Sequence, residues 1–179
     1  MNDDVDRELP MAVADALRET DATLAVAESC TGGLIGAALT AVPGASDYFH
    51  SGSTTYAYDA KRRRLGVSRE SLDEHGAVSE PVAREMARGV RDVADVTWGI
   101  ATTGIAGPTG GTEETPVGTV YVGVAYAGPW GSESSYSTVS RYVFDGDRAE
   151  VRARTVDAAF EDLLEEVERV RDDGAEADG

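Results

Sequence analysis

A serine, a cysteine and two glycines lie close together in the segment 28–33, Glu-Ser-Cys-Thr-Gly-Gly. Ser29 stands where a short apolar run ends and a helical pattern begins, which places its hydroxyl at the rim of a sheet. The residues Thr31, Gly32 and Gly33 offer backbone amides at a helix start, where an oxyanion can bind. The spacing indicates a serine nucleophile. The alternative is a serine or threonine that only caps the helix.

Lys61 is the one lysine in a chain whose other fifteen basic residues (16 − 1) are all arginine. A serine nucleophile needs a base, and lysine can act as one when burial or neighbouring charges lower its pKa toward neutrality. We expect Lys61, in a short helix that follows a strand, to point back over the end of that strand toward Ser29. Tyr56 would relay a proton or hold the serine hydroxyl.

The segment 103–118 is rich in glycine and holds two prolines, directly after a predicted strand. A loop of this length in a compact domain is more often functional, although a flexible surface connection is the alternative. Its first residues could present backbone amides to a phosphate or a sugar: Thr103, Gly104, Ile105, Ala106 and Gly107. The basic run 61–64 is a second possible seat for an anionic group, or else a solvated face.

Cys30 is the alternative nucleophile. If it continues the strand, its side chain points opposite to that of Ser29, so that only one of the two can face a cleft. A lone cysteine is usually a small buried apolar residue, and it excludes an internal disulfide. No spacing brings His50 or His75 beside Ser29 or suggests a metal site.

The elements that would position these residues alternate between helix and strand, which predicts one α/β domain. We expect a three-layer α/β/α sandwich around a mixed, mostly parallel sheet, because the last two strands look like antiparallel neighbours. Ligands bind beyond the carboxyl ends of the strands in such sheets. The patterns predict helices over residues 6–19, 34–42, 59–65, 68–75, 80–93 and from 146 onward, and strands over 23–28, 48–58, 97–102, 120–126 and 137–144.

The composition narrows the class of protein further. The 179 residues carry 33 acidic against 16 basic side chains, a net charge of −17, and 41% hydrophobic residues. This content supports a packed core rather than disorder, and no apolar run is long enough for a membrane span. The acidic beginning is unlike a signal peptide, so we expect a cytoplasmic protein. The acidic, lysine-poor composition is typical of halophiles and argues against a nucleic-acid partner.

Five segments together resemble the CinA C-terminal domain family, which includes stand-alone nicotinamide-nucleotide amidases. The resemblance is collinear over residues 6–170 and includes the motifs E-S-C-T-G-G, H-G-A-V-S and T-G-I-A-G-P. We expect residues 1–5 to be a flexible N-terminus and residues 171–179 a flexible acidic tail. The segments are 27–40, 52–67, 75–87, 103–122 and 144–152.

The resemblance implies an enzyme that hydrolyses nicotinamide mononucleotide to nicotinate mononucleotide and ammonia. It implies no metal or organic cofactor, a small nucleotide as substrate, no membrane partner, and a homodimer or higher homo-oligomer. The family's serine nucleophile falls on Ser29, its tyrosine on Tyr56, its lysine on Lys61 and its glycine-rich substrate loop on residues 103–107.

Two tyrosines set this chain apart from the family pattern. Tyr48 and Tyr58 depart from the family pattern, and we expect both near the pocket, where they would alter ring recognition.

The alternative function is a non-catalytic nucleotide-binding or interaction module of the competence or damage-inducible type. Such a module would keep the glycine-rich loop but would not need Ser29 or Lys61.

Overall fold

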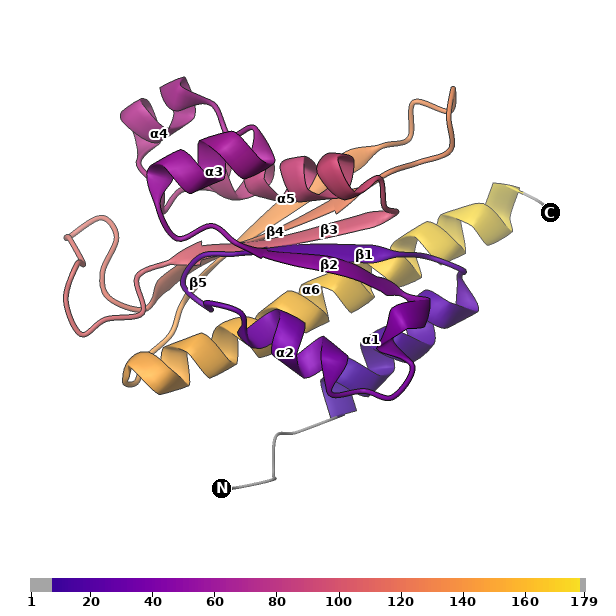
Figure 1. Ribbon diagram of the computed structural model, residues 1–179, viewed down its shortest axis with the longest axis horizontal. Helices are drawn as coiled ribbons and strands as arrows, with labels where there is room; N and C mark the ends of the chain where they lie inside the picture. Colours follow the sequence, from indigo (N-terminus) through magenta and orange to yellow (C-terminus); the bar gives the residue numbers. More distant parts are fainter. Residues whose placement is uncertain (1–7, 178–179) are drawn as a thin grey trace.

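One mixed sheet is built from five strands, in a computed structural model that describes residues 8–177. In chain order these are β1 (Leu24–Glu28), β2 (Phe49–Thr54), β3 (Trp98–Gly104), β4 (Thr119–Tyr126) and β5 (Tyr136–Val143). Their spatial order is β2-β1-β3-β4-β5 (Figure 1). β1 pairs in parallel with β2 and β3, while β4 is antiparallel to both β3 and β5. Only β4 therefore opposes the other strands, which confirms a mixed, mostly parallel sheet.

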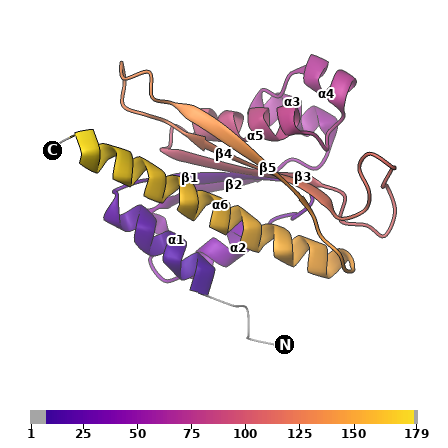
Figure 2. The ribbon, with the colours of Figure 1, turned by 180° about the vertical axis from the view of Figure 1, so that it is seen from behind.

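The helices cover both faces of this sheet and complete the expected three-layer α/β/α sandwich. Figures 1 and 2 show α3, α4 and α5 on one face, and α1, α2 and α6 on the other. The helices are α1 (Glu8–Glu19), α2 (Leu34–Thr40), α3 (Tyr58–Leu65), α4 (Arg69–His75), α5 (Glu80–Ala94) and α6 (Arg148–Ala177), with a short 3-10 helix, η1, at Ala45–Asp47.

The alternation of side chains along β1 divides the core into two parts. Leu24 and Val26 pack in the cluster beneath α1, α2 and α6. Ala25 and Ala27 pack in the cluster beneath α5. Successive side chains of a strand point to opposite faces, so the residues that follow Ala27 inherit this alternation.

Two glycines let α5 lie close against the sheet. A Cβ atom on Gly99 of β3 would stand 2.3 Å from the carbonyl oxygen of Ala87, and one on Gly123 of β4 would stand 2.6 Å from that of Ala83. Any larger residue at either position would push the helix outward. Close packing of this layer matters for the site because α3 packs on α5.

The boundaries differ from expectation at two places. β2 ends at Thr54 rather than at residue 58, because the next two carbonyl groups turn toward a side chain of α3 instead of a neighbouring strand. α6 continues to Ala177 rather than ending near residue 170, since the residues beyond 170 include good helix formers. Flexibility of residues 171–177 stays a prediction, and residues 1–5 lie outside the described part of the chain.

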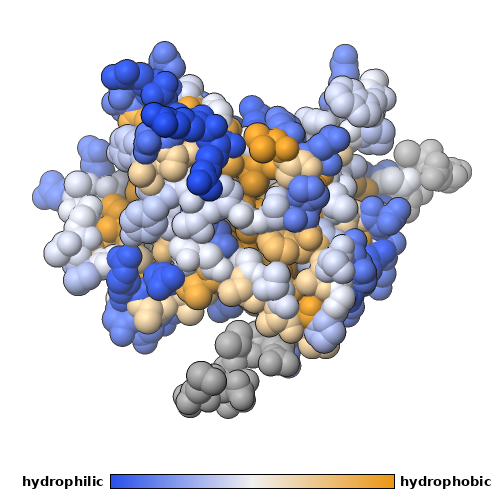
Figure 3. All heavy atoms as spheres, viewed as in Figure 1, coloured by the Kyte–Doolittle hydropathy of each residue, from blue (hydrophilic) through white to orange (hydrophobic). Residues whose placement is uncertain are grey.

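Hydrophilic and apolar side chains are unevenly distributed over the surface drawn in Figure 3. On the face drawn in Figure 3, hydrophilic side chains gather over α3 and α4, with smaller apolar patches between them and the other elements. Among residues 8–177, none of the helices has the length and apolar character needed to span a bilayer.

Candidate active site

Ser29 follows β1 directly, at the carboxyl end of three parallel strands. Its backbone N–H donates to the carbonyl of Thr102 on β3, over 3.0 Å. The alternation along β1 continues through this point, so Glu28 points to the α2 side and Ser29 to the α3 side. The sheet therefore holds Ser29 with its hydroxyl directed at α3.

Lys61 reaches Ser29 from the second turn of α3. Its side chain is fully buried, and its Nζ lies 3.0 Å from the Oγ of Ser29. The same Nζ donates to the carbonyl oxygens of Thr55, at 2.7 Å, and Tyr56, at 3.3 Å. The expected meeting of serine and lysine is thus confirmed by the geometry.

The surroundings of Lys61 weaken its hold on the proton. Burial lowers its pKa from 10.5 to about 8, and the nearby Cys30 opposes this shift. None of the ion pairs within residues 8–177 includes Lys61. A neutral amine has two N–H donors and one lone pair. The two carbonyl groups can accept both donors, which leaves the lone pair for the Ser29 hydroxyl.

A small cavity of about 180 Å³ opens beside this pair. Cys30 lines it, whereas Ser29 is turned toward Lys61 and is not among the lining residues. The expectation that only one of the two side chains faces the cleft holds, but the one that lines the cavity is the cysteine. Burial raises the pKa of the Cys30 thiol to about 11, so the thiol is protonated at neutral pH and is a poor nucleophile.

The amides after Ser29 are less available than the sequence suggests. The N–H of Gly32 donates to the carbonyl of Ser29 at 3.2 Å, and that of Gly33 donates to the Glu28 carboxylate at 2.9 Å. The side chain of Thr31 is buried against Thr102. Of the predicted set 31–33, only the amide of Thr31 stays free of an oxygen acceptor within the described residues, and it instead approaches the sulfur of Cys30.

Tyr56 lies at the cavity but does not contact the serine. Its side chain is 60% exposed, and its hydroxyl accepts a hydrogen bond from Arg148 at 3.0 Å. No hydrogen bond joins its hydroxyl to Ser29 or Lys61 in the described structure. Only its backbone carbonyl touches the lysine. The expectation that the Tyr56 hydroxyl holds the serine is therefore wrong, and a proton relay through Tyr56 stays a prediction.

Two arginines at the start of α6 reach the site, and sequence reasoning did not single them out. Arg148 lines the cavity and donates to the carbonyl of Gly107 at 2.7 Å. Arg152, one turn later, donates to the carbonyl of Thr31 at 2.7 Å, and its Nε is buried without a partner. Neither has a carboxylate partner among the residues that the structure describes. The segment 144–152, already part of the family resemblance, was the signal that could have found them.

The basic run after Lys61 takes no part in the cavity. The side chains of 62–64 are exposed, and Arg64 lines a different hollow with His50. These residues continue around α3 while Lys61 points inward, so the helix turns them away from the site. The expectation that this run holds an anionic group beside the serine is not supported by the geometry.

The glycine-rich loop forms much of the wall of this cavity. Gly104, Ile105, Ala106 and Gly107 all line it, as predicted. Thr103 does not, because it is buried and its hydroxyl donates to the carbonyl of Ala77 at 2.6 Å. The loop is held at its base by hydrogen bonds between Ile105 and residues 118–119.

The remaining candidates lie apart from the serine. His50 pairs with Ser51 and His75 with Glu74. Tyr48 is 1% exposed and its hydroxyl donates to the carbonyl of Leu39. It precedes β2 and so lies at the amino end of the parallel strands, away from the site, which corrects the expectation that it shapes the pocket.

Tyr58 begins α3, and its hydroxyl accepts from the amide of Ala77, whose carbonyl binds Thr103. It therefore contacts a neighbour of the glycine-rich loop and does not line the cavity itself. Within residues 8–177 no group of histidine, cysteine and carboxylate side chains is placed to hold a metal ion.

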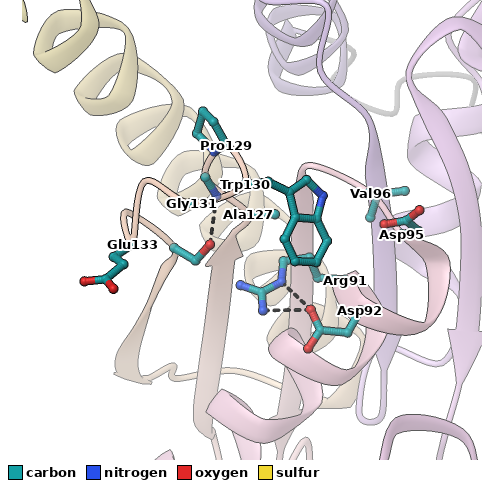
Figure 4. A pocket seen from close by; sticks show the side chains of 11 residues that line it. Arg91, Asp92, Asp95, Val96, Ala127, Pro129, Trp130, Gly131 and Glu133 are labelled. Carbon is teal, nitrogen blue, oxygen red and sulfur yellow. Dashed lines mark hydrogen bonds and ion pairs between the residues drawn. The ribbon is translucent and has the colours of Figure 1, made fainter.

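A larger hollow of about 480 Å³ lies at the other end of the sheet, beside the loop between β4 and β5. Figure 4 shows Trp130 standing at its rim and Arg91 paired with Asp92. Arg91 also donates to the carbonyl of Tyr126. The guanidinium of Arg91 is thus engaged by its neighbours, and no hydrogen bond between described residues joins a nucleophile to a base in this hollow.

Comparison with protein families identifies the architecture independently. The model of the CinA C-terminal domain matches residues 6–167. A CinA-like protein of Chlorobaculum tepidum is 49% identical over 156 residues, which cover 87% of this chain and 36% of that protein. A putative competence-damage inducible protein of Clostridium perfringens is 44% identical over 162 residues, or 90% and 38% of the two chains. The chain thus spans between a third and two fifths of these curated relatives.

Solved structures agree with the fold. The competence damage-inducible protein A of Klebsiella pneumoniae has a TM-score of 0.82 at 38% identity, covering 89% of this chain and 94% of that one. The competence/damage inducible protein CihA of Agrobacterium tumefaciens has a TM-score of 0.82 at 37% identity, covering 88% and 93%. These likenesses extend over nearly the whole of residues 8–177.

Proposed function

Because the chain belongs to the CinA C-terminal domain family, we propose that it is an amidohydrolase that converts nicotinamide mononucleotide to nicotinate mononucleotide and ammonia. One observation carries the proposal: a buried lysine amine lies 3.0 Å from a serine hydroxyl at the carboxyl end of the sheet. Serine activated by an adjacent base is the arrangement that acyl transfer requires.

The two carbonyl groups on Lys61 explain how the base is oriented. They accept its N–H groups at 2.7 and 3.3 Å, which turns the lone pair of the neutral amine toward Ser29. When the amine takes the serine proton, all three of its hydrogens have acceptors, because the Ser29 oxygen accepts the third. The site thus accommodates both protonation states of Lys61 without rearrangement.

The reaction then proceeds in two steps. Ser29 transfers its proton to Lys61 and its oxygen bonds to the carboxamide carbon. The protonated Lys61 returns the proton to the departing nitrogen, which leaves as ammonia and gives an ester between Ser29 and the nicotinate group. Water, deprotonated by the same amine, attacks this ester and releases the carboxylic acid and free Ser29.

Of the three amides first expected to bind the oxyanion, those of Gly32 and Gly33 are not available and that of Thr31 is. Gly32 and Gly33 already donate to Ser29 and Glu28. The amides of Cys30 and Thr31, which approach the Cys30 sulfur at the cavity wall, are the donors that the turn leaves. We assign them to the developing negative charge.

A phosphorylated substrate fits the charge of the cavity. Arg148 lies in its wall without a carboxylate partner in the described chain, although the protein carries 33 acidic residues against 16 basic ones. A guanidinium binds phosphate with two parallel hydrogen bonds. Arg148 would bind the phosphate group and so place the amide near Ser29.

The direct test is ammonia release from nicotinamide mononucleotide in molar KCl, with Ser29→Ala and Lys61→Met as variants. We expect release by the unmodified protein and none above background by either variant. Binding without turnover in the unmodified protein would instead identify a non-catalytic nucleotide-binding module. A cytoplasmic location, a homo-oligomeric state and the absence of nucleic-acid partners remain predictions from the sequence and its resemblance.

A further inference from the structure

Glu28 is a buried carboxylate, and both of its oxygens accept hydrogen bonds from the backbone of one helix start. It is 2% exposed. Its Oε2 accepts from the amides of Gly33, at 2.9 Å, and Ile35, at 3.1 Å, and its Oε1 accepts from Gly36 at 2.9 Å. The amide hydrogens and the positive end of α2 stabilise this charge.

These bonds close a loop around the serine. Glu28 is the last residue of β1, and the amides it binds begin at the end of the turn 29–33. These hydrogen bonds join the end of β1 to the start of α2, and Ser29 lies in the turn between the two. Arg152 holds the same turn from the α6 side through the carbonyl of Thr31.

We propose that Glu28 is a positioning residue, which fixes the turn 29–33 so that the hydroxyl of Ser29 stays within reach of Lys61. This proposal deepens the proposed function and rests on it. Glu28 touches neither the cavity nor Lys61, and it acts only through the backbone.

The glutamine variant isolates the carboxylate. Glu28→Gln keeps the shape of the side chain but turns an NH₂ group toward at least one of the three amides, so donor meets donor. We expect kcat for ammonia release to fall by about a hundredfold, since a displacement of about 1 Å at a nucleophile has that effect. KM should change by less than about threefold, because Arg148 and the loop 104–107 are untouched.

Glu85 supplies a matched control. Its carboxylate accepts from the amide and hydroxyl of Ser68 and the hydroxyl of Ser71, at the start of α4 and away from the cavity. Glu85→Gln removes a similar charge from a similar cap. We expect it to lower the unfolding temperature about as much as Glu28→Gln, with kcat unchanged. Equal losses of kcat in the two variants would reduce Glu28 to a structural role.

A second readout does not depend on turnover. Lys61 is the single lysine, so lysine labelled with ¹³C at Cε gives one resonance from this site. In Glu28→Gln we expect this resonance to move toward its position in Ser29→Ala, because the serine has left the amine. An unmoved resonance in a folded variant overturns the proposal, even if the substrate proves different. Should Glu28→Gln not fold, Glu28→Asp, which keeps the charge but not the reach, is judged by the same shift.

Discussion

At the scale of single residues, Lys61 is unusual because it is buried and forms no ion pair with any carboxylate of residues 8–177. Three oxygen atoms satisfy its amine, and burial rather than a neighbouring charge lowers its pKa to about 8. A pKa near the working pH is what a general base needs. Burial disfavours the charged form of any group, so it lowers the pKa of a lysine and raises that of a cysteine. The thiol of Cys30 therefore stays protonated and unreactive.

The first prediction separates the two adjacent nucleophiles. Ser29→Ala should lower kcat by at least about a thousandfold, since the attacking oxygen is lost. Cys30→Ala should keep kcat within about threefold, because its protonated thiol only lines the cavity. Steady-state ammonia release measures both. Loss of activity in Cys30→Ala together with activity in Ser29→Ala would move the nucleophile to the cysteine.

The second prediction concerns Arg148. Removing a charge-assisted hydrogen bond to a phosphate weakens binding by about 10–100-fold, so Arg148→Gln should raise KM by that factor. Arg63→Gln, in the exposed run on α3, is the matched control and should leave KM unchanged. The reverse result would restore the run 62–64 as the phosphate site.

At the scale of elements, the site is made where three junctions meet. The β1–α2 turn carries Ser29, the β2–α3 junction carries Lys61, and the start of α6 carries Arg148. Lys61 also binds the junction itself, through the carbonyls of Thr55 and Tyr56. This is the physical reason why β2 ends early and why the proposed catalytic role of Lys61 cannot be separated from its structural role.

The third prediction follows from the lowered pKa of Lys61. Below about pH 8 both the folded and unfolded chains bind the proton, and the folded state carries the full cost of burying the charge. Between pH 8 and 10.5 only the unfolded chain binds it, so this group makes the folded state more stable as pH rises. Relative to Lys61→Met, the free energy of unfolding should increase by about 3 kcal/mol from pH 7 to 10.5.

Urea denaturation across this pH range measures the difference. The tyrosines and the cysteine also titrate at high pH, but their contributions to the free energy of unfolding are the same in both proteins and cancel in the comparison. Arg62→Met, on the exposed side of α3, serves as the control and should show a difference from the wild type that does not vary with pH. If the difference in free energy of unfolding between the wild type and Lys61→Met also did not vary with pH, Lys61 would have the same pKa in the folded and unfolded chains.

Local patterns were enough to predict part of this site. The meeting of Ser29 and Lys61 follows from the end of an apolar strand and from a lone lysine one turn into a helix. Pairings that join distant segments were not predictable. Tyr56 and Arg148 lie 92 positions apart, and only the packing of α6 brings them together. Tyr48 was placed near the pocket by the family resemblance, although it stands at the start of a parallel strand whose carboxyl end faces the site.

The three-layer order itself was predictable because helix and strand alternate along the chain. The role of Glu28 was not predictable, because a carboxylate at the end of a buried strand gives no sign of where it finds donors. Its amides come from residues five to eight positions later, after a turn in which Gly32 and Gly33 both adopt positive φ.

At the scale of the whole molecule, a net charge of −17 on 179 residues sets the conditions in which the fold is stable. Mutual repulsion of surface carboxylates opposes compaction and also repels an anionic substrate. Salt shortens the range of both effects, from about 10 Å at 0.1 M to about 3 Å at 1 M.

The fourth prediction is therefore a strong dependence on salt. We expect the unfolding temperature to rise steadily between 0.1 and 2 M KCl, and KM for a phosphorylated substrate to fall over the first part of that range. Thermal melts followed by circular dichroism and initial rates measure the two effects. A melting temperature that is the same at both ends of the range would contradict the halophilic interpretation of the composition.

The most direct test of the account is the pKa of Lys61, read from the one Cε resonance of protein made with ¹³C-labelled lysine. A titration from pH 6 to 11 should give a midpoint near the value of about 8 set by burial, and Ser29→Ala should move that resonance because the hydroxyl is its neighbour. A midpoint at the ordinary value of 10.5, unaffected by Ser29→Ala, would mean that the amine is no base for the serine.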